Sequence, residues 1–270
     1  MLDLHGVRKV FHPGTPYKVV ALDGISLEVE KGSFVIIIGT NGSGKSALLN
    51  AIAGSVPFES GRISLMGRDI TGWPEHLRSK YIGRVFQNPL MGTITELTVA
   101  ENLVLSSSRS TLRSLRTAVT RRSMNDIKDR VASLKLGLET RLNEKMGALS
   151  GGQRQALTLL MATWTGPDLL LLDEHTAALD PKSAELVLHL SEQIISHERM
   201  TAIMVTHSIQ QAVNLGDRLV MMHRGRIAHD DTGPDKQRLR VRELLSRFEM
   251  IRCGEQVDQN AAVMLAEQII

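Results

Sequence analysis

Residues 34–53 read FVIIIGTNGSGKSALLNAIA. The apolar run at 34–38 is typical of a strand buried on both faces, and residues 47–53 have a helical pattern that Gly54 closes. Between them, residues 39–46 match G-x-x-x-x-G-K-[ST] at every fixed position. At ordinary residue frequencies a chain of this length would show such a match by chance about once in a hundred cases. The stretch therefore predicts a strand, a phosphate-binding loop and a helix.

The residue types of this loop explain how it would hold a nucleotide. Glycines let the backbone curl and present N–H groups to an anion, and the following helix adds its positive end. Lys45 is expected to reach the β- and γ-phosphates, and the Ser46 hydroxyl to bind Mg²⁺. The predicted nucleotide contacts of this segment are Gly39, Asn41, Gly42, Ser43, Gly44, Lys45, Ser46 and Ala47.

An acidic pair ends a second apolar run, at residues 169–172. Ligands of parallel sheets bind at the carboxyl ends of the strands, so this pair would lie beside the phosphate loop. Asp173 is predicted to hold Mg²⁺ through water, and Glu174 to be the base for the attacking water. Taken alone, a strand that ends in a solvated acidic pair would be an equal alternative.

Two more strand ends carry polar candidates. His207 follows the apolar run at 202–205, and Gln87 follows a strand pattern at 81–86. A lone histidine is more often structural, but at this edge it would lie near the γ-phosphate. The Gln87 amide oxygen could ligate Mg²⁺ or water and sense phosphate. We predict catalytic roles for Glu174, His207 and Gln87, and Mg²⁺ contacts for Ser46, Gln87 and Asp173.

Apolar strands that alternate with helices predict an α/β fold with a mostly parallel core sheet and helices on both faces. Residues 1–36 alternate like strands and predict an N-terminal antiparallel β region. Helical patterns at 97–145 interrupt the alternation, which predicts a helical lobe inserted at about 90–150. The main domain is expected to span 1–230, and a short helical extension 231–270.

Composition limits the partners and the location. The 270 residues include 32 basic and 29 acidic ones, a net charge of +3. This mild excess does not by itself indicate nucleic acid, whose binding usually needs a concentrated basic face. No run reaches the roughly 18 apolar residues of a membrane span, and the N-terminus lacks a signal-peptide pattern. We expect a cytoplasmic protein that contacts a membrane through a partner.

A last motif, Leu149–Gln153 (LSGGQ), precedes a helical pattern about 20 residues before the acidic pair. Ser150 is a good helix cap. The glycines leave the N-terminus of the following helix exposed, which gives the chain a second helix end that can bind an anion. With these motifs together, the sequence resembles the ABC ATPase family over residues 1–230. The resemblance rests on the phosphate loop, Gln87, residues 149–153, Asp173 and Glu174, residues 178–180, and His207.

The resemblance implies a P-loop NTPase fold, ATP and Mg²⁺ as cofactors, and ATP hydrolysis. In that family two subunits meet head to tail, and each ATP lies between one phosphate loop and the other subunit's signature motif, to which residues 149–153 correspond here. This implies ATP contacts by Ser150, Gly151, Gly152, Gln153 and Asp180. The chain has one copy of each half, so a two-fold homodimer would complete two sites.

Three further positions depend on the family pattern. Relatives stack adenine on an aromatic ring ahead of the first strand pair; Phe11 is best placed, and Tyr17 is the alternative. His175 and Ala177 stand where many relatives have Pro and Ser. Neither change removes a phosphate-contacting group, so hydrolysis is still expected.

Residues 88–95 and the lobe correspond to the region that contacts membrane subunits in transporters of this family. The sequence of residues 81–93 and 173–190 resembles that of bacterial import ATPases, which are paired with a periplasmic binding protein for an amino-acid-like solute. This implies an importer motor held on the inner face of the cell membrane by a permease. An exporter or lipid-extraction motor remains open. A non-transport ABC ATPase is disfavoured, since those usually have tandem domains or long coiled-coil insertions.

Overall fold

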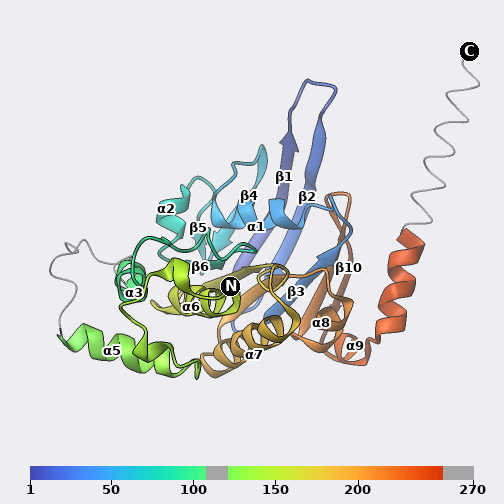
Figure 1. Ribbon diagram of the computed structural model, residues 1–270. Helices are drawn as coiled ribbons and strands as arrows, with labels where there is room; N and C mark the ends of the chain where they lie inside the picture. Colours follow the sequence, from blue (N-terminus) through green and yellow to red (C-terminus); the bar gives the residue numbers. More distant parts are fainter. Residues whose placement is uncertain (108–120, 252–270) are drawn as a thin grey trace, which may run out of the picture.

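The computed structural model describes residues 1–107 and 121–251, which form two sheets (Figure 1). The smaller sheet is antiparallel, in the order β2-β1-β4-β5. Its strands are β1 (Leu2–Phe11), β2 (Val19–Val29), β4 (Ser60–Leu65) and β5 (Arg68–Asp69). The larger sheet has the order β10-β9-β3-β8-β7-β6. Its strands are β3 (Phe34–Gly39), β6 (Ile82–Val85), β7 (Leu169–Asp173), β8 (Thr201–Val205), β9 (Arg218–His223) and β10 (Arg226–Thr232).

The larger sheet is parallel except for the pair of β9 and β10, as predicted. Both of its faces are buried, which explains the continuous apolar runs in the sequence. Val35 and Ile37 pack on the side of the smaller sheet, while Ile36 and Ile38 pack on the other side. The two faces therefore belong to two separate hydrophobic clusters.

Helices cover both faces of the larger sheet. The face toward the smaller sheet carries α1 (Lys45–Ala53). The short α2 (Glu75–Arg78) contacts the end of α1 through Arg78. The other face carries α6 (Gly151–Thr163), α7 (Pro181–His197), α8 (Ile209–Asn214) and, farther out, α3 (Val99–Ser107) and α5 (Arg121–Ala132). After β10 come α9 (Gly233–Arg238) and a helical stretch at 241–251.

Local chemistry sets the helix ends. Pro181 occupies the first turn of α7, and the Asp180 carboxylate accepts a hydrogen bond from the Ser183 N–H at 3.0 Å. Gly54 ends α1 in the left-handed conformation, with φ of 81°. The predicted helix at 47–53 is therefore present.

The prediction of a mostly helical 97–145 is wrong in part. Residues 133–137 and 141–145 are not helical, and the short 3₁₀ turn at Leu138–Thr140 lies between them. The Val99 and Ala100 N–H groups donate to the carbonyls of Glu144 and Leu142 at 2.9 and 3.0 Å. This segment thus satisfies the free N–H groups at the start of α3, an interaction that helical periodicity does not register.

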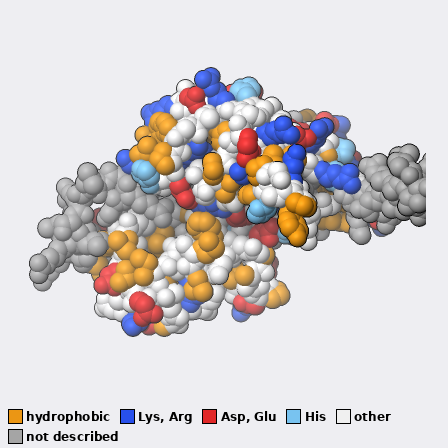
Figure 2. All heavy atoms as spheres, turned by 90° about the horizontal axis from the view of Figure 1, so that it is seen from above, with side chains coloured by type: hydrophobic (Ala, Val, Ile, Leu, Met, Phe, Trp, Pro, Cys, Tyr) orange, Lys and Arg blue, Asp and Glu red, His pale blue; other side chains and the backbone are white. Residues whose placement is uncertain are grey.

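Residues 108–120 of the predicted lobe and 252–270 of the predicted extension lie outside the described residues. The domain boundary at 231 therefore stays a prediction. Within 1–107 and 121–251, no helix has the length and apolar character of a membrane span. On the face in Figure 2, hydrophobic side chains form several separate groups among charged ones.

A buried cation holds the end of α1. Arg78 is 3% exposed, and its guanidinium donates to the carbonyls of Ala51, Ile52, Trp73 and Thr71 at 2.8–3.0 Å. Burial lowers the pKa of Arg78. Four carbonyls that would otherwise lack partners are thus satisfied by one side chain.

We expect Arg78→Met to lower the free energy of unfolding by roughly 2–4 kcal/mol, because it leaves the buried carbonyls of Ala51 and Ile52 without this donor. Chemical denaturation measures this value. The exposed neighbour Lys80 provides the control, and Lys80→Met should change the value by less than about 0.5 kcal/mol. Equal effects of the two substitutions would refute this role of Arg78.

His175 is buried behind the end of β7, with 1% exposure. Its Nε2 lies 2.9 Å from the Ser191 hydroxyl, which itself donates to the Val187 carbonyl at 2.8 Å. Because the Ser191 hydroxyl already donates its proton to Val187, it can only accept from His175, and Nε2 must carry the hydrogen. Nδ1 is buried and has no hydrogen-bond partner among the described residues. Burial lowers the pKa of His175 to about 4.

This depressed pKa predicts a pH-dependent stability. The unfolded chain takes up a proton on His175 near pH 6.5, while the folded chain does so only near pH 4. Stability is therefore present above pH 6.5 and is lost as the pH falls, by about 2 kcal/mol between pH 7.5 and 5.0. Denaturation of the protein and of His175→Asn at both values tests this. The variant should lose about 2 kcal/mol less than the parent over this interval, and an identical loss would contradict the assignment.

Candidate nucleotide site

Four parallel strands deliver the predicted site residues to one edge of the larger sheet. β3, β8, β7 and β6 are neighbours in that order. Near their carboxyl ends Ile37 pairs with Val205, and Val205 pairs with Asp173. The phosphate loop, His207, the acidic pair and Gln87 each follow one of these strands. The structure thus brings together four segments that are far apart in the sequence.

Lys45 lies inside the phosphate loop. It is 5% exposed, and its ammonium donates to the carbonyls of Gly39 and Thr40 at 2.9 and 3.1 Å. Burial lowers the pKa of Lys45, while the charges of Glu174 and Asp173 act in the opposite direction. The ammonium is therefore held by the carbonyls of its own loop, in the field of both carboxylates.

The loop also needs glycine at two close approaches. A Cβ at Gly39 would lie 2.2 Å from the Met222 carbonyl oxygen, and one at Gly44 would lie 2.2 Å from that of Ala21. Gly44 also has φ of 102°, which side chains rarely tolerate. The loop thus packs tightly on β9 and on β2.

The loop residues fit a phosphate group. The Ser43 hydroxyl is buried and has no hydrogen-bond partner among the described residues. The N–H groups of the first turn of α1, at Lys45 and Ser46, have no acceptor within the helix. Donors of this kind, gathered at a helix N-terminus beside a lysine, match the oxygens and charge of a phosphate.

Glu174 and His207 form a pair at the ends of β7 and β8. His207 Nε2 lies 2.5 Å from Glu174 Oε1, and the Glu174 side chain is 13% exposed while that of His207 is 46% exposed. Glu174 has φ of 45°, a conformation that costs about 1 kcal/mol or more and is often found at functional sites. A carboxylate fixed in this way can accept a proton from a water that reaches it.

The predicted magnesium residues offer a hydroxyl, an amide oxygen and a carboxylate, and Mg²⁺ prefers such oxygen ligands. Ser46 and Gln87 are exposed at the sheet edge. The Asp173 side chain is 15% exposed, and its Oδ2 lies 3.1 Å from Arg84 Nη2. The donor set fits the ion, and few protein ligands are needed because phosphate and water supply the rest.

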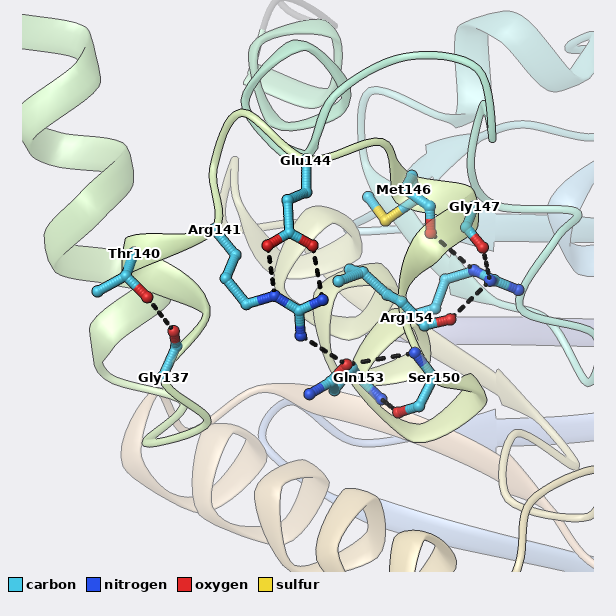
Figure 3. Close-up of polar contacts among 10 residues, drawn as sticks. Gly137, Thr140, Arg141, Glu144, Met146, Gly147, Ser150, Gln153 and Arg154 are labelled. Atoms are coloured by element: carbon cyan, nitrogen blue, oxygen red, sulfur yellow. Dashed lines mark hydrogen bonds and ion pairs between the residues drawn. The ribbon is translucent and has the colours of Figure 1, made fainter.

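The signature residues form the cap of α6 (Figure 3). The Ser150 hydroxyl accepts from the Gln153 N–H at 3.3 Å, and the Gln153 amide oxygen accepts from the Ser150 N–H at 3.2 Å. Arg141 donates to the same amide oxygen at 3.3 Å and makes a two-pronged ion pair with Glu144 at 2.6 and 2.8 Å. The predicted cap is present, with Arg141 supporting it.

The structure does not bring the signature to the phosphate loop of the same chain. Among the described residues, no hydrogen bond or ion pair joins residues 150–153 to residues 39–46. A Cβ at Gly152 would lie 2.7 Å from the Ser183 side chain, so α6 starts against α7. Asp180 caps the start of α7 by accepting a hydrogen bond from the N–H of this same Ser183. The signature and Asp180 thus form a group apart from the loop.

Phe11 ends β1, where it pairs with Val19. Its ring lies 5.2 Å from the Lys9 ammonium, so one face is used within the chain. Tyr17, the alternative, is 80% exposed in the connection between β1 and β2. The adenine contact of either ring stays a prediction.

Two polar residues near the site were not identified from the sequence. Arg84 stands in the otherwise apolar strand β6, and Gln155 is 0% exposed in α6. The Gln155 amide donates to the carbonyls of Phe86 and His175 at 2.9 and 2.7 Å, which ties the strand before Gln87 to the segment after Glu174. A polar side chain within a buried pattern was the available signal, because such groups need partners.

Comparison with known proteins agrees with this geometry. The family described as ABC transporter matches residues 22–177. A tyrosine transport ATP-binding protein of Clostridioides difficile (strain R20291) is 41% identical over 251 residues, which cover 92% of this chain and 99% of that protein. A lipoprotein-releasing system ATP-binding protein of Rhodopseudomonas palustris (strain ATCC BAA-98 / CGA009) is 35% identical and covers 84% and 98% of the two chains.

Solved structures give the same result. The dimeric structure of a post-hydrolysis ATP-binding cassette bound to ADP and Pi has a TM-score of 0.74 and 27% identity, covering 86% of this chain and 98% of that chain. The ADP conformation of an ATP-binding cassette of an ABC transporter has a TM-score of 0.75 and 28% identity, covering 94% and 98%. The P-loop NTPase fold and the ATPase activity follow from these matches together with the motifs above. The chain therefore belongs to the ABC transporter family, as an ATP-binding and ATP-hydrolysing subunit.

Proposed function

We propose that this chain dimerises on ATP and drives the import of a small amino-acid-like solute through partner membrane subunits. The observation that carries the importer proposal is the 41% identity to a tyrosine transport ATP-binding protein, which extends over 99% of that relative. A periplasmic solute-binding protein would deliver the solute. The residues of the site are proposed to bind ATP. None of the residues described above is placed to contact the solute.

The relative of the lipoprotein-releasing system, at 35% identity, supports a second candidate, a motor that extracts lipidated protein. Affinity purification of the chain from native membranes, followed by mass spectrometry, separates the two. Recovery of a permease with a periplasmic solute-binding protein is the expected result. Recovery of a lipoprotein-handling permease without a binding protein would contradict import.

The loop at residues 88–98 supports docking on membrane subunits. Leu90, Met91 and Ile94 are 46%, 70% and 49% exposed, although apolar residues of this size are usually buried. They lie between Gln87 and α3, so a partner seated there would touch the segment that leads to the nucleotide site. In this proposal the chain lies in the cytoplasm, on the inner face of the membrane.

The residues at the sheet edge divide the work of hydrolysis. Lys45 and the loop N–H groups hold the phosphates, and Ser46, Gln87 and Asp173 would hold Mg²⁺. When bound, Mg²⁺ neutralises phosphate charge that develops during transfer. Glu174 accepts the proton of the attacking water, and His207 fixes the Glu174 carboxylate at 2.5 Å. Phe11 would stack on the adenine.

The signature completes the site of a second copy. Ser150, Gly151, Gly152, Gln153 and Asp180 stand apart from the phosphate loop of their own chain, which supports contact with ATP bound by a partner. A helix N-terminus with exposed Ser150 and Gly151 is suited to a phosphate. Two-fold symmetry then builds two identical shared sites.

We expect Glu174→Gln to keep ATP binding, to lower turnover by roughly 10²–10⁴-fold because the general base is lost, and to accumulate an ATP-dependent dimer. Phosphate release and size-exclusion chromatography with ATP measure both effects. Glu185→Gln, on the exposed face of α7, is the control and should hydrolyse at the parent rate. Near-normal turnover of Glu174→Gln would remove Glu174 as the base.

We expect Ser150→Arg to spare ATP binding by the monomer but to block the ATP-dependent dimer, because the long cation occupies the phosphate end of α6. Loss of the cap should cost only about 1 kcal/mol of stability, which thermal unfolding checks. Ser150→Thr keeps a capping hydroxyl and is the matched control for stability. A normal ATP-bound dimer of Ser150→Arg would argue against the shared site.

A further inference from the structure

Arg84 is a charged residue within the buried strand β6. The side chains of Arg84 and Asp173 are 12% and 15% exposed. A buried guanidinium is costly unless it is paired and hydrogen-bonded. The surroundings of Arg84 therefore have to supply several acceptors, and one of those that it has is the carboxylate of Asp173, the predicted magnesium residue.

Three acceptors surround the guanidinium, one each from α1, the loop that follows α1, and β7. Nη2 donates to Asn50 Oδ1 at 2.7 Å and to Asp173 Oδ2 at 3.1 Å, while Nη1 donates to Ser55 Oγ at 3.2 Å. Asn50 lies on α1 and Ser55 just beyond it. The guanidinium also stacks on the Phe86 ring, at 4.6 Å from its centroid. Arg84 therefore joins β6, β7 and the helix of the phosphate loop.

Strand geometry explains why Arg84 meets Asp173. In the parallel pair of β6 and β7, Arg84 pairs with Leu171. Asp173 lies two residues beyond Leu171 and so points to the same face of the sheet. That face packs against α1, since Leu171 belongs to the same cluster as Leu48 and Ile52 of α1. The alternation of the strands thus aims both side chains at the helix that starts with Lys45.

We propose that Arg84 is a positioning residue that fixes the Asp173 carboxylate for magnesium binding. This rests on the role of Asp173 proposed above. The bond from Arg84 occupies Oδ2, and Oδ1 has no hydrogen-bond partner among the described residues. A carboxylate held by one oxygen cannot rotate freely, so its second oxygen keeps one direction. Residues that orient a metal-binding carboxylate in this way commonly change metal affinity by about 10–100-fold.

Two effects of Arg84 on the ion oppose one another. Its positive charge repels Mg²⁺, while its hydrogen bond orients the oxygen that the ion or its water would use. Orientation should dominate, because the guanidinium is itself fixed by Asn50, Ser55 and Phe86 and so holds Asp173 in one place. Removal of Arg84 should therefore weaken the magnesium contribution to nucleotide binding rather than strengthen it.

The test compares affinity for a fluorescent ADP analogue in excess Mg²⁺ with that in EDTA, and takes the ratio as the magnesium factor. In Arg84→Met this factor should fall by about 10-fold or more, while affinity in EDTA stays within about 3-fold of the parent. Arg62→Met, which breaks only the exposed pair with Asp69, is the control and should keep the parent factor.

If Arg84→Met does not fold, Arg84→Lys carries the test, because one ammonium cannot reproduce the planar fork that reaches three acceptors. Its magnesium factor should still fall several-fold. Thermal unfolding of the nucleotide-free variants confirms that each is folded.

Three results would overturn the proposal. If nucleotide affinity fell equally in Mg²⁺ and in EDTA, Arg84 would only support the phosphate loop. An unchanged factor in a folded variant would give it no role in binding the ion. A larger factor would make it a competitor of Mg²⁺. Asp173→Asn separates this from the function proposed above: if it keeps the parent factor, Asp173 is not the magnesium residue, and the assignment itself fails.

Discussion

The site depends on the alignment of four parallel strands, whose carboxyl ends meet at one edge of the larger sheet. Because the side chains of a strand alternate between two faces, a shift of one residue in any pair would turn its polar end away from the others. Such a shift would also move the side chains of β3, β7 or β8 from one closely packed hydrophobic cluster into the other, which the packing of both clusters opposes. The packing of the core thus sets the geometry of the chemistry.

Charge balance adds a second constraint at this edge. Lys45, Arg84 and the Asp173–Glu174 pair are all mostly buried, and none of them would be stable there alone. Lys45 uses loop carbonyls and the field of both carboxylates, Arg84 binds Asp173, and His207 binds Glu174. A change in one member therefore affects the others, and effects of single substitutions here should not be additive.

The sequence predicted the parts of the structure that local chemistry dictates. The phosphate loop, the acidic pair at the end of β7 and the Ser150 cap have fixed residue types at fixed spacings, and each is found where it was expected. Residues 133–145 were predicted wrongly because the segment after the 3₁₀ turn pairs with the start of α3, a contact between residues about 45 positions apart. Arg84 and Gln155 were missed for the same reason. Their partners lie on other elements, and no local pattern records such contacts.

The central claim is that each nucleotide is shared between the phosphate loop of one copy and the signature of another. The most direct measurement is chemical cross-linking of a chain with Cys253 replaced by Ser, Glu174 by Gln, and cysteines at Asn41 and Ser150, both exposed. With ATP, a short bifunctional maleimide should give a covalent dimer on a denaturing gel, and without nucleotide a monomer. Monomer alone in both conditions, or the same dimer yield without ATP, would contradict the shared site.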